Sequence, residues 1–229
     1  VPMISDVPLM REAAAEWAWN AKGRSPREFA LSCAVRQGFK DPEKFAEWSD
    51  TQGPVAWDVY GSEWPAGEKR GVPGKVADLL KQGKLSDLGY VLWEVYPTPW
   101  GDIKTVEQLD RDVAQAKRAV RLALELGDEM FIQESLAVQG YINSLKALWE
   151  LKQVVTPDGV AGPKKQTAKQ HFKMYVDSLD QTRKALTAWE DALPARGGRA
   201  GIMRESVKLV DGMIGEMTAV AAELGCSPQ

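Results

Sequence analysis

Apolar residues in the second half of the chain recur at alternating steps of three and four, and this spacing constrains the fold most. Three stripes show it: Val106, Leu109, Val113, Ala116, Val120 and Ala123; Ala168, Phe172, Tyr175, Leu179, Thr182, Leu186 and Trp189; and Met203, Val207, Val210, Ile214, Met217, Ala221 and Leu224. Such spacing gives a helix one apolar side, which packs against the apolar side of another helix. The segment 128–155 is apolar on more than one side, so we expect it to be the most buried of these helices.

The breaks between these segments predict an antiparallel four-helix bundle over 105–229. Thr105 and Gln108 have the spacing of a capping box, and Gly127 permits a tight reversal. The later breaks, 156–163 and 194–201, are short and rich in Pro and Gly. Loops of this length join helices that are antiparallel neighbours.

The first region, 1–104, predicts a less regular set of short helices rich in tryptophan. Ser25, Pro26 and Glu28 form a start signal with a capping box, and Gly38 ends that helix. We expect further helices at 9–19, 41–49, 55–60, 75–82 and 87–96, and a Pro- and Gly-rich loop at 61–74. Because neither region contains a credible strand pattern, the sequence predicts an all-α fold.

Composition excludes several classes of function. The net charge of −3, with both signs interspersed, argues against a nucleic-acid-binding surface. No apolar run approaches the roughly 20 residues that cross a bilayer. The single histidine, His171, rules out a multi-histidine metal site, and no motif for a nucleotide or another cofactor is present. Cys33 and Cys226 would pair only if the fold brought the two ends of the chain together.

Nine tryptophans are the most unusual count, and two explanations fit them. Large aromatic side chains anchor short helices to one another, whereas exposed indoles stack on sugar rings. The candidates for carbohydrate stacking are Trp64, Trp93 and Trp100, which lie in or beside Pro- and Gly-rich segments. The carboxylates near these aromatics show no spacing that enforces an acid–nucleophile pair, so we assign no catalytic residue.

A basic cluster marks the start of the helix expected after 163. Lys164, Lys165, Lys169 and Lys173 crowd one segment that has no acidic residue among them. Positive charge at a helix N-terminus is mildly unfavourable, so this cluster indicates either an anionic partner or a solvated face.

The segment from 16 to 30 carries a resemblance to a known family. Trp19-Asn20, followed by Arg24-Ser25 and Glu28-Phe29, resembles a junction in the (β/α)8-barrel glycoside hydrolases that act on N-acetylhexosaminides, the family 20 and family 84 types. In those enzymes the chain leaves the catalytic barrel at such a segment and enters a helical domain. The resemblance therefore implies the carboxyl-terminal region of a sugar hydrolase. Trp17, Trp19 and Asn20 would form its interface with an upstream catalytic domain.

These observations lead to one functional expectation and two alternatives. We expect a non-catalytic accessory domain that supports a glycoside hydrolase barrel and contributes to its substrate cleft or to a homodimer contact. The alternatives are a carbohydrate-binding module that uses exposed tryptophans and a scaffolding or oligomerisation bundle. If the parent degrades polysaccharides, a secreted or periplasmic location follows.

Overall fold

The computed structural model describes residues 16–18, 22–60, 76–89, 99–192 and 203–227, and its architecture is helical. The elements are α2 (Pro26–Gln37), α3 (Pro42–Tyr60), α5 (Val76–Lys81), α6 (Val106–Leu126), α7 (Glu129–Lys152), the 3-10 helix η2 (Gly162–Lys164), α8 (Lys165–Ala192) and α9 (Arg204–Glu223). The described residues contain no strand, only an isolated bridge between Thr156 and Gly159. The predicted all-α fold is confirmed.

The helix boundaries follow the capping residues closely. The Ser25 amide donates to Glu28 at 2.7 Å, while the Glu28 amide donates to the Ser25 hydroxyl at 3.3 Å, which completes the predicted capping box of α2. Gly38 ends that helix at a φ of 75°, a conformation that glycine adopts without strain. At α6 the Thr105 hydroxyl caps the Gln108 amide, but the Gln108 side chain accepts from the Lys104 amide and not from Thr105.

Helix α3 differs from the prediction. The sequence predicts two helices, 41–49 and 55–60, whereas α3 runs unbroken past Pro54. Gly53 and Pro54 lie on the exposed side of α3, while Gln52 and Val55 are buried. Burial of the opposite side therefore compensates for the backbone hydrogen bond that proline cannot make. The predicted helix at 87–96 is also wrong where it is described, because 87 has no regular structure and 88–89 form a turn.

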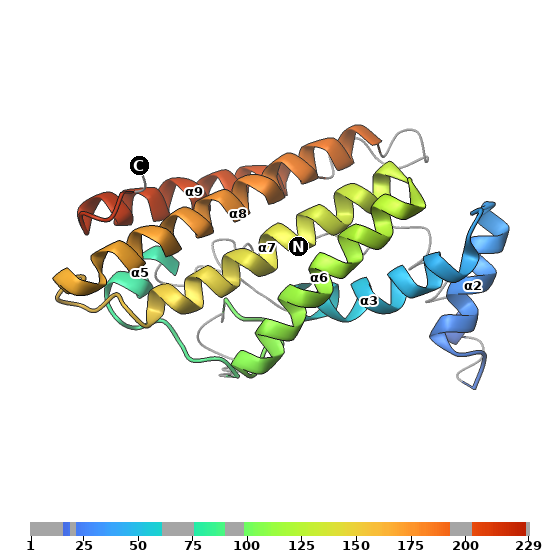
Figure 1. Cartoon of the computed structure of the whole chain (residues 1–229), viewed down its shortest axis with the longest axis horizontal. Coiled ribbons are helices and arrows are strands. Elements are labelled where there is room, and N and C mark those ends of the chain that lie inside the picture. The colour runs from blue at the N-terminus through green and yellow to red at the C-terminus, as the bar shows by residue number, and fades with distance from the viewer. Residues whose placement is uncertain (1–15, 19–21, 61–75, 90–98, 193–202, 228–229) are drawn as a thin grey trace.

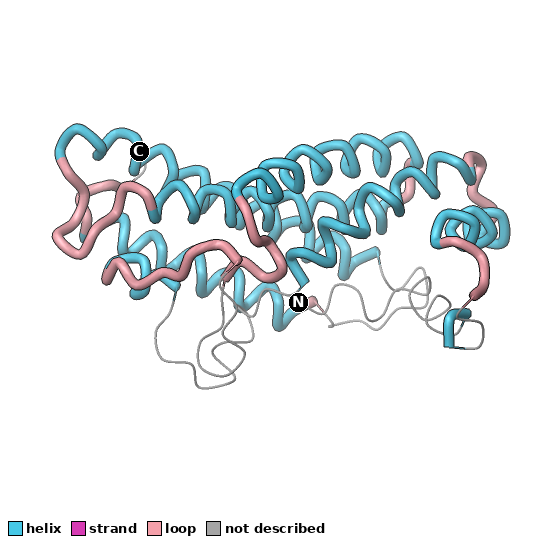
Figure 2. The backbone as a smooth tube through the Cα atoms, turned by 90° about the horizontal axis from the view of Figure 1, so that it is seen from below, coloured by secondary structure: helices cyan, strands magenta, loops and turns pink. Residues whose placement is uncertain are grey.

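The long helices pack in the order of the chain. Helix α7 packs against α6 and α8, and it is the most buried of the four long helices, as predicted. Helix α9 packs against α8 and α5, and within the described residues it does not pack extensively on α6 (Figure 1). These contacts therefore do not confirm the predicted antiparallel four-helix bundle. Figure 2 shows the same helices from below as an elongated molecule.

The two regions predicted from sequence share one hydrophobic core. Helix α3 packs on α6 and α7 and brings Phe45 and Trp48 against Phe131. The ring centroids of Trp48 and Phe131 lie 4.5 Å apart, and the Trp48 indole N–H donates to the Ser135 hydroxyl at 2.8 Å. Helix α2 packs extensively only on α3 among the described elements, so it forms one end of the molecule (Figure 1).

Candidate functional site

Helix α2 has apolar side chains on two opposite sides. Its inner side packs on α3 through four buried residues, Phe29, Ala30, Cys33 and Ala34. Beyond this side, on the outer side of the helix, lie Leu31, which is half-buried and still packs against the core, and Val35, which is 65% exposed. Val35 is the most exposed large hydrophobic residue in the described part of the chain. Burial in the protein itself therefore does not explain why this position is apolar.

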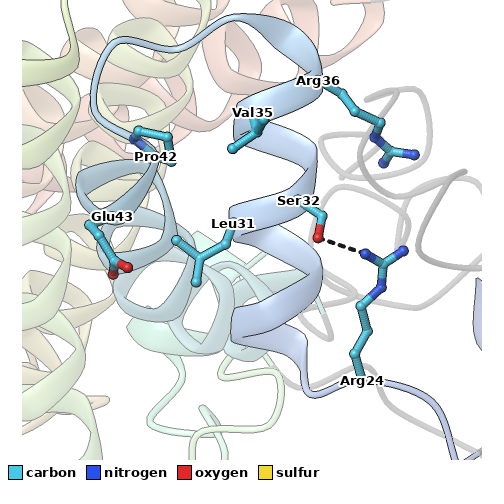
Figure 3. A pocket seen from close by; sticks show the side chains of 7 residues that line it. All are labelled: Arg24, Leu31, Ser32, Val35, Arg36, Pro42 and Glu43. Atoms are coloured by element: carbon cyan, nitrogen blue, oxygen red, sulfur yellow. Dashed lines mark hydrogen bonds between the residues drawn. The ribbon is translucent and has the colours of Figure 1, made fainter.

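A shallow groove of about 690 Å³ follows this outer side, and we call its lining the α2 surface. It consists of Arg24, Leu31, Ser32, Val35, Arg36, Pro42 and Glu43. Figure 3 shows Leu31 and Val35 on the side of Pro42 and Glu43, with Arg24 and Arg36 on the other side of the helix. The α2 surface thus combines apolar side chains with a basic edge and an acidic edge.

Arg24 fixes the basic edge of the α2 surface. Its guanidinium donates to both carboxylate oxygens of Glu16, at 3.0 and 3.1 Å, and to the Ser32 hydroxyl at 2.6 Å (Figure 3). Hydrogen bonding to Arg24 lowers the pKa of Glu16, and the charge of Arg36 lowers it further. The guanidinium groups of Arg24 and Arg36 thus lie close to two carboxylates, those of Glu16 and Glu28.

Trp17 lies beside the same helix. Its ring centroid is 5.2 Å from that of Phe29 at an interplanar angle of 46°, and the side chain is half-buried. The other two predicted interface residues, Trp19 and Asn20, lie outside the described residues. Of the three predicted interface residues, Trp17 is therefore the one that the structure describes, and its ring contacts Phe29 on the inner side of α2.

The predicted stacking tryptophans do not form a platform in the described part of the chain. Trp100 is fully buried, its indole N–H donates to the Ser86 carbonyl at 3.0 Å, and its ring meets Trp149 edge-on. The expectation that Trp100 is exposed is therefore wrong, because the residue fills the core beneath its own turn. Trp64 and Trp93 lie outside the described residues.

The exposed indole is one that the sequence did not single out. Trp57 on α3 is 60% exposed, and the neighbouring Gly53 and Pro54 are exposed as well. A correct helix boundary would have shown this, since position 57 lies opposite the buried positions 52, 55 and 59 once α3 is continuous.

The basic cluster lies where the sequence places it. Lys164 ends η2, while Lys165, Lys169 and Lys173 follow in the first turns of α8. Lys173 donates to Asp177 one turn later at 2.9 Å, so one of the four charges is already paired within the helix. The other three form a solvated edge, and we assign no ligand to it.

Buried carboxyl groups form a second cluster that the sequence analysis missed. Asp112 on α6 is 1% exposed and forms a carboxyl–carboxyl contact with Asp58 at the end of α3. Burial raises the pKa of Asp112 to about 7, with a further contribution from the negative charge of Asp58. The signal was available, because Asp112 stands between Leu109 and Ala116, beside the apolar stripe of its helix.

Glu134 on α7 is a second buried acid. It is 7% exposed, and burial alone raises its pKa to about 8. Neither the α2 surface nor a groove of about 440 Å³ between α7 and α8 is lined by Glu134, Asp112 or Asp58. Asp112 and Glu134 are both almost fully buried, so we assign these two carboxyl groups to the interior of the fold.

The remaining candidates from the sequence are the single histidine and the two cysteines. His171 is half-buried, and its Nδ1 atom has no hydrogen-bond partner in the described part of the chain. Cys33 and Cys226 are both buried, and no disulfide joins them. No cluster of His, Cys, Asp and Glu suited to a metal ion occurs among the described residues.

In the part of the chain that the structure describes, no helix combines the length and the apolarity that a bilayer span requires. No family model matches the chain, and neither a curated protein nor a solved structure matches it significantly.

Proposed function

We propose that this chain is a non-catalytic helical domain that packs against a neighbouring domain through the α2 surface and Trp17. The observation that carries the proposal is the exposed apolar side of α2, a helix that packs extensively only on α3 among the described elements. The resemblance at Trp19-Asn20 suggests the neighbour, namely the catalytic barrel of a glycoside hydrolase that acts on N-acetylhexosaminides.

The size of the α2 surface favours a neighbour in the same polypeptide. A helix of 12 residues is about 18 Å long, whereas a stable contact between separate proteins buries about 800 Å² on each partner. One exposed side of α2 is too small to bury an area of this size. A covalently linked domain needs less contact area, because linkage raises the effective concentration to the millimolar range.

Hydrogen exchange tests this proposal. We expect the amides of α2 to exchange more slowly in the full-length polypeptide than in this chain alone, and the substitution Val35→Glu to abolish the difference. Leu124→Glu is a matched control, since Leu124 is 57% exposed on α6, away from the α2 surface. Equal exchange of α2 in the two proteins, or an equal effect of both substitutions, would contradict the proposal.

A separate hydrolysis assay tests the proposal that the chain is non-catalytic. The isolated chain should not hydrolyse aryl N-acetylglucosaminides. Turnover that disappears on replacement of a single carboxylate in this chain would show that it is an enzyme in its own right.

Trp57 supports a second candidate, a carbohydrate-binding module. An indole that is 60% exposed on a rigid helix presents the kind of apolar face on which a sugar ring stacks. We expect titration with chitin oligomers to change the tryptophan fluorescence, and Trp57→Ala to weaken binding about tenfold or more, which corresponds to about 1.4 kcal/mol. Leu124→Ala, which also truncates an exposed apolar side chain, should bind like the wild type. Flat titrations across a broad panel of glycans would remove this candidate.

A further inference from the structure

Three segments of the chain meet at the carboxyl pair of Asp58 and Asp112. Asp58 lies near the end of α3, Asp112 lies in the second turn of α6, and the segment 99–104 connects into α6. The side-chain Nε2 atom of Gln108 donates to the Asp58 carboxylate at 2.8 Å and to the Asp102 backbone carbonyl at 3.3 Å. The Asp102 amide in turn donates to the Asp58 carbonyl at 3.2 Å. Each of the three segments is therefore hydrogen-bonded to the other two.

Asp58 accepts a hydrogen bond from Gln108, but the Asp112 Oδ2 atom has no donor among the described residues when both carboxyl groups are ionised. A carboxylate only accepts hydrogen bonds, so two carboxylates in contact repel each other unless a proton lies between them. The Oδ2 atom of Asp112 is buried and receives no hydrogen bond from the described residues. A proton on Asp112 satisfies this atom, because it converts a buried acceptor into a donor to Asp58.

The surrounding charges do not compensate for the pair. On α6, the Arg111 Nε atom is 3.8 Å from the Asp112 Oδ1 atom, but the Arg111 side chain is 60% exposed and its attraction is screened. Helix α7, which packs on α6, contributes Lys146, whose ammonium group pairs with Asp110 at 2.8 Å and with Glu150 at 3.0 Å. Helix α3 contributes Asp58 itself, which adds negative charge.

We infer that a proton shared between Asp58 and Asp112 holds the end of α3 and the segment 99–104 against the start of α6. This junction, which we call the clasp, loosens when the proton leaves. Burial and the charge of Asp58 raise the pKa of Asp112 to about 7. Because this pKa lies above the value of 3.8 for an exposed aspartate, the clasp is closed in acid and opens as the pH rises through neutrality. The device responds to a change in pH within the range that cells and their surroundings span.

Two measurements on the complete chain test this inference. A carbon NMR titration of the Asp112 carboxyl should have its midpoint near neutrality, and a midpoint below about pH 5 would overturn the inference. The protection factor of the Asp102 amide, corrected for the intrinsic exchange rate, should fall about fivefold or more between about pH 5 and about pH 9. A flat protection factor would also overturn it.

Substitution separates the clasp from a general effect of pH. Asp112→Asn replaces the protonated acid by an uncharged donor of the same shape, so protection of the Asp102 amide should become independent of pH. Asp110→Asn, on the exposed side of the same helix, should leave the pH dependence of the wild type unchanged. If Asp112→Asn does not fold, Asp58→Asn removes the repulsion from the other side and should likewise abolish the dependence. Persistence of the wild-type dependence in the Asn variant that folds would contradict the inference.

Discussion

At the scale of single residues, Gly140 fixes how closely α7 and α8 approach. A Cβ atom at this position would lie 2.4 Å from the Thr182 hydroxyl oxygen and 2.6 Å from the Ser178 carbonyl oxygen. The carbonyl belongs to the backbone of α8, so the two helices would have to separate. We expect Gly140→Ala to lower the free energy of unfolding by about 1–3 kcal/mol, measured by urea denaturation.

The control for Gly140 is another helical glycine with open space around it. Gly212 on α9 has no atom within 4 Å of an added Cβ. Gly212→Ala should raise the free energy of unfolding by about 0.5–1 kcal/mol, because alanine favours the helix. If both substitutions had the same sign, close packing at Gly140 would not be the cause.

Residue burial could be predicted from the sequence only where the helix register was known. The stripe of α6 predicts that Leu109 and Ala116 are buried, and both are. Position 112 lies beside this stripe, one turn from both Leu109 and Ala116, but an aspartate there offers no hint that its partner is Asp58 on α3. Trp100 was misjudged for a related reason, since its partners, Ser86 and Trp149, come from distant segments.

At the scale of elements, local signals fixed helix ends better than helix interiors. Ser25 and Gly38 bound α2 as expected, because a capping residue acts on backbone groups within its own turn. A break between 49 and 55 was expected, yet α3 continues through it and packs against α6 and α7. That packing depends on residues far away in the sequence, such as Ser135, which bonds to Trp48 across 87 positions, so no local pattern contains it.

The order of the helices in space was also beyond local patterns. An apolar stripe shows that a helix is buried on one side, but it does not name the helix that covers it. The stripe of α9 is satisfied by α8 and α5 in the described structure, whereas a closed bundle would have required α6. The outer side of α2 poses the same question, and there the proposed answer is a neighbouring domain.

At the scale of the whole molecule, one core links every part of the described chain. Residues from α2, α3, α5, α6, α7, α8 and α9 belong to a single hydrophobic cluster. The aromatic contact of Phe45 and Trp48 with Phe131 joins the Trp-rich region to the later helices. A charge placed inside this core therefore acts on the stability of the whole fold and not on one helix.

The titration of Glu134 allows the effect of a charge in the core on the stability of the fold to be measured. Burial raises its pKa from 4.5 to about 8, so the folded protein holds a proton that the unfolded chain releases. The contribution of this group to stability is complete below about pH 4.5, falls as the pH rises, and is lost above about pH 8. We expect the free energy of unfolding to decrease by up to about 5 kcal/mol across this range, since each pKa unit corresponds to about 1.4 kcal/mol.

Denaturant unfolding at several pH values separates Glu134 from the other acids. Glu134→Gln should flatten the decrease, because glutamine carries no charge at any pH. Part of the slope should remain in this variant, since Asp112 titrates in the same direction with a pKa of about 7. Glu129→Gln, at the exposed start of the same helix, should keep the full slope of the wild type. A slope in Glu134→Gln equal to that of the wild type would mean that the core admits water to this carboxylate, because only a hydrated carboxylate ionises without cost to the fold.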